Sequence, residues 1–194
     1  MKFLAIVAFV FTTFTMQLSA NAASGGYYGF NVGAGFPFVT QGGFTYATGG
    51  SFSMDINYNS FSISDGQAEL SLTKPEVNVK WHPFSGSFFL GLGIGQQTLS
   101  TEATDLGSGL SITVDVSSMM ITPSLGWMWG VSNGGFFMGL DFGMTMPQGA
   151  ELDIDDSSGI ASSTQAYQDA EDLAEQFGKT SFPVFTFLRL GYLF

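Results

Sequence analysis

The chain has 194 residues, only 11% of them are charged, and its formal net charge is −11 at neutral pH. Because ordinary soluble domains carry about 25% charged residues, this composition argues against a conventional soluble fold. The negative balance argues against nucleic acid as a partner. The sequence contains no cysteine, which excludes disulfides, thiolate catalysis and cysteine-ligated metals.

The first residues have the pattern of a secretory signal peptide. Lys2 supplies the positive charge, residues 3–16 are apolar, and Ala20 and Ala22 fit a cleavage site. The apolar stretch is shorter than the roughly 20 residues that span a bilayer, so a membrane anchor is the less favoured interpretation. We expect residues 1–22 to be removed and residues 23–194 to form one domain.

Apolar residues alternate with small or polar ones along the first half of the chain, which predicts strands. The expected strands cover residues 28–36, 44–46, 52–63 and 70–81. In the third the alternation slips near Ser60, and in the fourth it slips near Pro75. A slip of one residue is what a β-bulge produces, so we expect a bulge at each position.

The second half shows three further strands and two long connections. A strand over residues 88–95 is followed by a polar connection from about Gln97 to Ser118, in which the next strand begins. That strand spans residues 119–129, and the turn residues at 132–135 lead into a seventh strand over residues 136–146.

The longest expected loop runs from about residue 147 to 180. It holds eight of the sixteen acidic residues, between Glu151 and Glu175. Ser162 and Gln165 form a capping box before an apolar stripe, which predicts one short amphipathic helix over residues 163–177. The acidic run is either a solvated loop or the place where an extracellular ligand or divalent cation binds.

An eighth strand covers residues 181–194. One face carries Leu190, Tyr192 and Phe194, and the other carries Phe185, Phe187 and Arg189. A final aromatic residue, with a second aromatic two positions earlier on the same face, resembles the C-terminal assembly signature of bacterial outer-membrane β-barrels. The hairpin from Trp81 to Leu90 also resembles one that recurs in such barrels.

The resemblance is to small barrels of the OmpA and OmpW type. It implies an all-β fold, an eight-stranded antiparallel transmembrane up-and-down β-barrel in the bacterial outer membrane. It further implies contact with outer-membrane lipid, delivery by periplasmic chaperones and the barrel-assembly machinery, a monomeric state and no cofactor.

The lengths of the connections predict which end of the barrel faces the periplasm. Connections after even-numbered strands are tight, which is typical of periplasmic turns. The lipid-facing residues nearest those turns are aromatic, as in an interfacial girdle, and include Trp81, Phe88, Trp127, Trp129 and Phe136. A soluble barrel with its apolar face inside is the alternative, but it would carry charges on its outer face.

Few charged residues fall on the inward faces. Asp141 and Arg189 lie at matching heights on the last two strands, so we expect them to form a luminal ion pair. Asp55, Glu76 and Lys80 form a second luminal polar group, in which Asp55 is expected nearer Glu76 than Lys80. Both groups are interpreted as structural, with a gate or an ion path as the alternative.

The lumen of an eight-stranded barrel is narrow enough for side chains to fill. The leading hypothesis is therefore an envelope structural or surface-interaction protein with a plugged lumen. The alternative is a narrow, porin-like conduit or binding site for small hydrophobic molecules. A lipid-modifying enzyme is the least favoured, because the single histidine, His82, lies beside a periplasmic turn; we expect no catalytic residues and no metal site.

Overall fold

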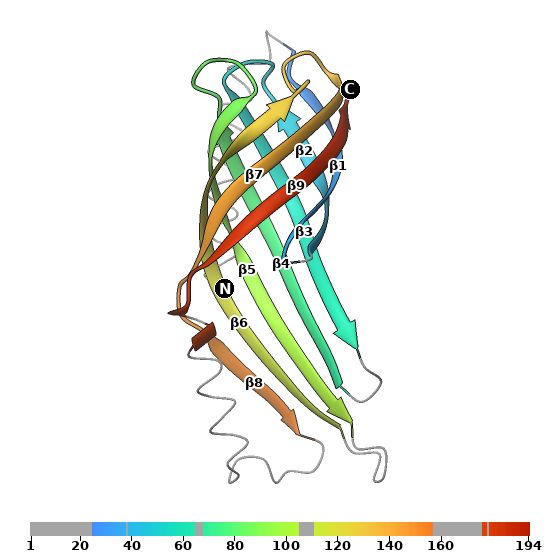
Figure 1. Ribbon diagram of the computed structural model, residues 1–194, viewed down its shortest axis with the longest axis vertical. Coiled ribbons are helices and arrows are strands. Elements are labelled where there is room, and N and C mark those ends of the chain that lie inside the picture. The colour runs from blue at the N-terminus through green and yellow to red at the C-terminus, as the bar shows by residue number, and fades with distance from the viewer. Residues whose placement is uncertain (1–24, 38, 65–67, 105–110, 157–175, 178) are drawn as a thin grey trace.

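Eight antiparallel strands close into a barrel in the computed structural model (Figure 1). The structure describes residues 25–37, 39–64, 68–104, 111–156, 176–177 and 179–194. The strands are β1 (Tyr27–Phe36), β2 (Val39–Ala47), β3 (Phe52–Ser64), β4 (Ala68–Trp81), β5 (Phe88–Thr104), β6 (Ser111–Trp129), β7 (Gly135–Pro147), β8 (Glu151–Asp156) and β9 (Phe182–Leu193). Each barrel strand pairs with the next along the chain, β7 pairs with β9, and the predicted up-and-down topology is confirmed.

The ends of the barrel sheet meet where β9 pairs with β1. Val32 lies opposite Leu190 in this ladder. Beyond it, the Tyr28 amide donates to the Phe194 carbonyl at 3.2 Å, and the Phe194 amide donates to the Tyr28 carbonyl at 2.9 Å. A closed sheet of this kind satisfies its backbone hydrogen bonds without leaving an open edge.

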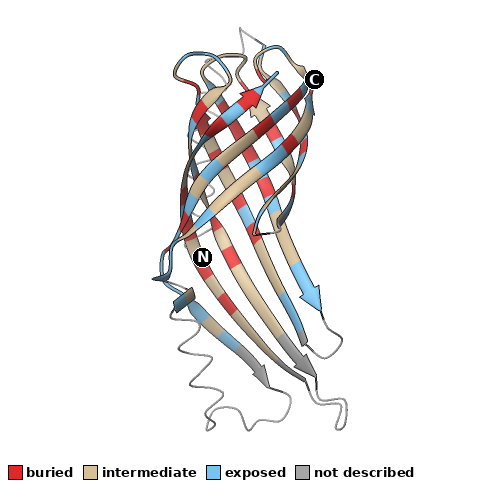
Figure 2. Ribbon diagram, viewed as in Figure 1, coloured by how far each residue is buried: buried red, intermediate tan, exposed pale blue. Residues whose placement is uncertain are grey.

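The outside of the barrel is apolar. Exposed and buried residues alternate along the strands (Figure 2), as expected where successive side chains point to opposite faces. Large hydrophobic side chains occupy the exposed positions, among them Phe30, Leu92, Leu125, Phe142 and Tyr192. Within the described residues, no helix has the length and hydropathy of a membrane-spanning helix.

The expected bulges at Ser60 and Pro75 are not present. β3 and β4 pair in one unbroken register, from Phe52 opposite Trp81 to Ser64 opposite Glu69. The alternation therefore continues, and what changes is the face on which the apolar residues lie. Along β4 the inward residues are polar from Lys80 to Lys74. Beyond Lys74 the inward residues are Leu72 and Leu70.

A bulge that the sequence did not predict lies in β9. The pairing of β9 with both neighbours shifts by one residue near Leu188. The predicted inward positions of Phe185 and Phe187 are therefore wrong. Phe187 is 54% exposed, and the Phe185 ring stacks at 4.3 Å on the exposed Phe142 ring.

One side of the barrel wall is much taller than the other, as Figure 1 shows for β5 and β6. These strands remain paired as far as Thr104 opposite Ser111, so the predicted polar connection between them is largely strand. β8 lies outside the barrel and pairs with the outer part of β6. We call residues 61–64, 69–73, 97–104, 111–118 and β8 the outer extension.

Two predictions fall where the structure gives no description. The signal peptide, with its boundary at residue 22, lies outside the described residues. So does most of the expected helix over residues 163–177, of which only residues 176 and 177 are described.

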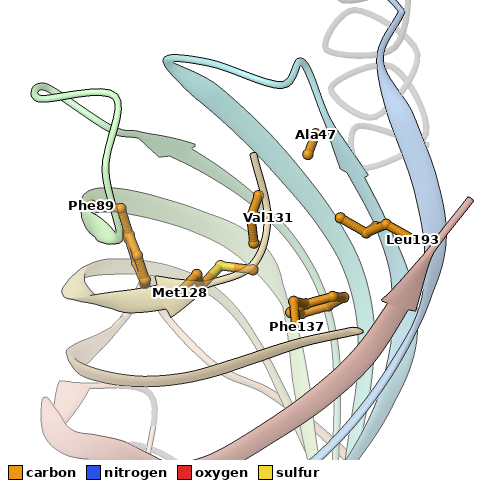
Figure 3. Packing of buried hydrophobic residues seen from close by; sticks show 6 residues of the cluster. All are labelled: Ala47, Phe89, Met128, Val131, Phe137 and Leu193. Carbon is orange, nitrogen blue, oxygen red and sulfur yellow. The ribbon is translucent and has the colours of Figure 1, made fainter. Parts of the chain in front are cut away.

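The lumen is closed at the end where the tight turns lie. Side chains from several strands and one turn pack there into a hydrophobic cluster (Figure 3), formed by Ala47, Phe89, Met128, Val131, Phe137 and Leu193. We call this cluster the floor. Gly191 makes room for it, because an added Cβ would collide with the Phe137 ring.

Candidate functional site

A network of four charged side chains lies in the lumen directly above the floor. Asp55 is 0% exposed and forms ion pairs with Lys80 and with Arg189, whose Nη1 lies 2.5 Å from Asp55 Oδ2. Arg189 Nη2 also lies 3.0 Å from Asp141 Oδ2. The structure thus brings together two groups that the sequence analysis treated separately.

The network crosses the barrel. Asp55 belongs to β3 and Arg189 to β9, which are separated in the wall by β1 and β2. Lys80 links the network to the floor. Its ammonium group lies 4.9 Å from the Phe89 ring centroid and 3.4 Å from Met128 Sδ. The charged network and the apolar floor are therefore in direct contact.

Neutral polar side chains hold the Asp55 carboxylate in place. Thr45 donates to Asp55 Oδ1 at 2.8 Å, and Asn31 donates to the Thr45 hydroxyl at 2.9 Å. Asn31 also contacts Asn57, and Gln41 donates to Asn31 Oδ1 at 3.2 Å. This ladder comes from the inward positions of β1, β2 and β3, where alternation predicts small polar residues.

Glu76 has a different partner from the expected one. In the register Asp55 lies opposite Asn78, midway between Glu76 and Lys80, and it pairs with Lys80. Glu76 pairs instead with Lys74, at 3.5 Å. The expectation that Asp55 lies nearer Glu76 is wrong because it assumed a tighter turn after Ser64, whereas Ser64 lies opposite Glu69 in the ladder and Asp55 therefore lies opposite Asn78.

Lys74 is the luminal residue that sequence reasoning missed. Its ammonium group donates at 3.2 Å to Thr145 on β7, across the lumen from β4. The signal was present in the sequence, since residues 74, 76, 78 and 80 form one uninterrupted alternation of polar residues. Assigning a bulge at Pro75 hid this alternation.

Charges in the described part of the lumen balance. Three carboxylates face three cations: Asp55, Glu76 and Asp141, with Lys74, Lys80 and Arg189. Since an unpaired charge in a dry interior is costly, each of these side chains depends on a partner.

Above the network lies a cavity of about 60 Å³. Its lining includes Asn57, Lys74, Glu76, Asn78 and Arg189. Gly93 leaves space for Glu76, because a Cβ at this position would collide with its carboxylate. Two buried atoms of the lining have no hydrogen-bond partner, namely Glu76 Oε1 and Arg189 Nε.

His82 lies in the turn between β4 and β5, away from this cavity. Its Nδ1 lies 3.1 Å from the Gly86 carbonyl, and its Nε2 lies 3.0 Å from Ser53 Oγ. The Gly86 carbonyl only accepts, so the neutral ring carries its proton on Nδ1. Burial lowers the pKa of His82, and the nearby Lys80 charge acts in the same direction.

The aromatic residues of the expected girdle surround the end of the barrel that carries the tight turns. Trp81, Trp129 and Phe136 are exposed there, and the Phe88 and Trp127 rings pack edge to face at 5.7 Å. The last strand adds exposed Tyr192 and Phe194, whereas Leu190 is half-buried. Within the described residues, no three acidic or histidine side chains converge to form a metal site.

No protein-family model and no curated protein matches the sequence. Among solved structures, the chain is similar to CarO from Acinetobacter baumannii, with a TM-score of 0.43 and 16% identity, over 86% of this chain and 97% of that chain. It is also similar to CarO2 from Acinetobacter baumannii, with a TM-score of 0.40 and 12% identity, over 87% and 98% of the two chains.

Proposed function

We propose that this chain is an outer-membrane β-barrel protein with a structural or surface-interaction role in the bacterial envelope. The observation that carries the proposal is the inverted distribution of polarity: large apolar side chains cover the outside while the ion pairs lie inside. In water this arrangement would expose an apolar surface on all sides, whereas in a bilayer it is the expected one.

The closed lumen favours a structural role over a conduit. The floor blocks the inner end with fully buried rings, including Phe89 and Phe137. Ion pairs between β3, β4, β7 and β9 brace the wall above it. A solute would have to disrupt both layers to pass, so we propose a barrel without a permanent pore.

The alternative of a binding site is favoured by one specific observation, the cavity on the outer side of the ion network. Its polar lining disfavours a purely hydrophobic guest. No reaction is proposed, because the histidine lies in the turn below the floor and hydrogen-bonds neighbouring residues.

The surface role is assigned to the outer extension. Its outward positions carry Glu69, Asp115, Glu151 and Asp153, and Asp115 lies directly opposite Asp153. We expect an extracellular ligand or divalent cation to meet this acidic face, and outer-membrane lipid to meet the apolar band below it. Periplasmic chaperones and the barrel-assembly machinery are the proposed partners during assembly, with a monomer as the final state.

Two measurements on the full chain test the proposal. The protein should need detergent or lipid to remain monodisperse, and it should migrate differently on SDS gels before and after heating. In planar bilayers it should show no discrete conductance steps. A monodisperse sample in plain buffer would contradict the membrane location, and regular conductance steps would contradict the closed lumen.

Calcium titration of the purified protein tests the acidic face. Saturable heat that is reduced by Asp115→Asn would support cation binding there, with Thr98→Ser as a neutral control on the same face. A titration without heat would leave a soluble ligand, and not a cation, as the proposed partner.

A further inference from the structure

The lumen opens progressively towards its outer end. Along the inward face of β4, exposure rises from 1% at Lys80 to 8% at Glu76, 9% at Lys74 and 37% at Leu70. We call the cavity, together with Leu70 and Leu72 above it, the outer vestibule. Within the described residues it is closed below by the floor and exposed at its outer end.

Two polar atoms in this vestibule lack partners. Glu76 Oε1 can only accept a hydrogen bond, and Arg189 Nε can only donate one. Both side chains are more than nine-tenths buried and line the same cavity. Buried polar groups are normally hydrogen-bonded, so a guest that both donates and accepts would complement these two side chains.

The size and the charge of the cavity restrict this guest. A water molecule needs roughly 15 Å³ of such space, so about 60 Å³ has room for a group of a few heavy atoms. The three luminal carboxylates and three luminal cations already balance. A guest with a net charge would disturb that balance, whereas a neutral amide or hydroxyl group would not.

An apolar surface continues from the cavity. Leu72 lines the cavity and lies opposite Phe61, and the next inward pair is Leu70 opposite Ile63. Ile63 is 59% exposed. A molecule whose polar group lies between Glu76 and Arg189 would therefore place an attached hydrocarbon chain along these side chains.

We propose that the outer vestibule binds a small neutral amphiphile from the outer side, with an amide or hydroxyl head in the cavity and a short apolar tail against Leu72 and Phe61. The inference rests on the proposed function, because it requires a membrane barrel whose outer end faces the medium. It names a class of ligand for the cavity on the outer side of the ion network.

The test uses the full chain in lipid nanodiscs and hexanamide as the probe. Acetamide, which has the same head without the tail, is the matched ligand, and empty nanodiscs provide the blank. We expect saturable calorimetric binding of hexanamide above the blank, and binding of acetamide weaker by about tenfold or more, since each buried methylene strengthens binding.

Two variants locate the site. Leu72→Ser should weaken hexanamide binding about tenfold by removing the apolar contact. Thr73→Ser, one residue away on the outward face, should bind like the wild type. If Leu72→Ser fails to fold, nuclear Overhauser contacts between the hexanamide methyl group and the Leu72 methyl groups of the wild type provide the same information.

Failure of the two proposals can be distinguished. A chain that does not enter nanodiscs, or shows no heat-dependent migration, contradicts the proposed membrane barrel. A folded barrel that gives only the blank signal, or binds hexanamide equally well as Leu72→Ser, overturns the amphiphile site. A high-resolution structure with hexanamide present that shows water alone in the cavity would overturn it too.

Discussion

The wall of the barrel and, apart from β8, the outer extension are built from the same strands in the same register, yet their polarity is opposite. On β4 the outward residues at barrel level are Val77 and Val79, and in the extension they are Ser71 and Glu69. The inward residues change in the reverse sense, from Lys80 and Glu76 to Leu72 and Leu70. The strands themselves continue without interruption.

The medium outside a strand decides the side on which its apolar residues lie. At barrel level the proposed medium is hydrocarbon, and the polar groups gather in the lumen, where they pair. In the extension the proposed medium is water, so the charged side chains face outward and the apolar ones turn inward. The phase slip in the sequence thus marks the proposed boundary between the two media.

The largest expected effect comes from removing the central carboxylate of the lumen. Asp55→Asn leaves two buried cations, Lys80 and Arg189, without the charge that they share, and should lower the free energy of unfolding by about 3–5 kcal/mol. Denaturant titration in phospholipid vesicles, followed by tryptophan fluorescence, measures this loss. Asp153→Asn in the outer extension should change stability by less than about 0.5 kcal/mol. Equal midpoints for the two variants would show that the luminal pairs do not stabilise the barrel.

A charge placed on the outward face tests the boundary directly. Leu92 and Thr98 lie on the same face of β5, and Leu92 is 49% exposed. Leu92→Arg should cost about 2–4 kcal/mol if it faces hydrocarbon, and Thr98→Arg about 0–1 kcal/mol at or beyond the interface. The same vesicle titration applies to both. A small cost at Leu92 would mean that this part of the wall does not face lipid.

Much of the fold could be predicted from the sequence, because alternation with a period of two indicates both the strands and their faces. In β7 more exposed and less exposed residues alternate from Phe136 to Met146, as a period of two predicts. The Asp141 and Arg189 pair could be anticipated because its strands are neighbours in the predicted order. Pairs between neighbouring strands follow from register alone.

The remainder could not be predicted, for two physical reasons. A slip in alternation has the same appearance whether a bulge shifts the backbone or the medium changes, which is why Lys74 was missed. Phe187 was misplaced because both faces of β9 are largely apolar near the bulge, so that the bulge leaves no slip in the pattern. Contacts across the lumen, such as Arg189 with Asp55, depend on the curvature of the closed wall and on side-chain length. Neither quantity is encoded in a local pattern.

A smaller loss of stability is expected from a substitution where β1 pairs with β9. The Tyr28 and Phe194 rings meet edge to face with centroids 5.2 Å apart, on the outside of the β1 and β9 junction. Tyr28→Leu keeps an apolar side chain but removes the aromatic pair, which should cost about 0.5–1.5 kcal/mol. Ile63→Leu in the outer extension is the control and should be neutral within about 0.5 kcal/mol. A loss no larger than that of the control would exclude a stabilising role for this aromatic pair.

The smallest expected effect concerns pH and involves the turn below the floor. Burial first, and then the charge of Lys80, lowers the pKa of His82 in the folded chain below its ordinary value of about 6.5. Between the folded and the unfolded pKa the unfolded state binds more protons, so stability falls as the pH falls. The contribution of the neutral ring is complete above pH 6.5 and is lost as the pH decreases through the lower, folded pKa.

His82→Gln keeps a hydrogen-bonding side chain that does not titrate in this range. The difference in unfolding free energy between wild type and His82→Gln should therefore be constant above pH 7 and should shrink on acidification, when only the wild type loses stability. Unfolding titrations at pH 8, 7, 6 and 5 measure this difference. A difference that stays constant, or that grows as the pH falls, would mean that His82 does not need to be neutral in the folded turn and that the Ser53 and Gly86 contacts hold the charged ring equally well.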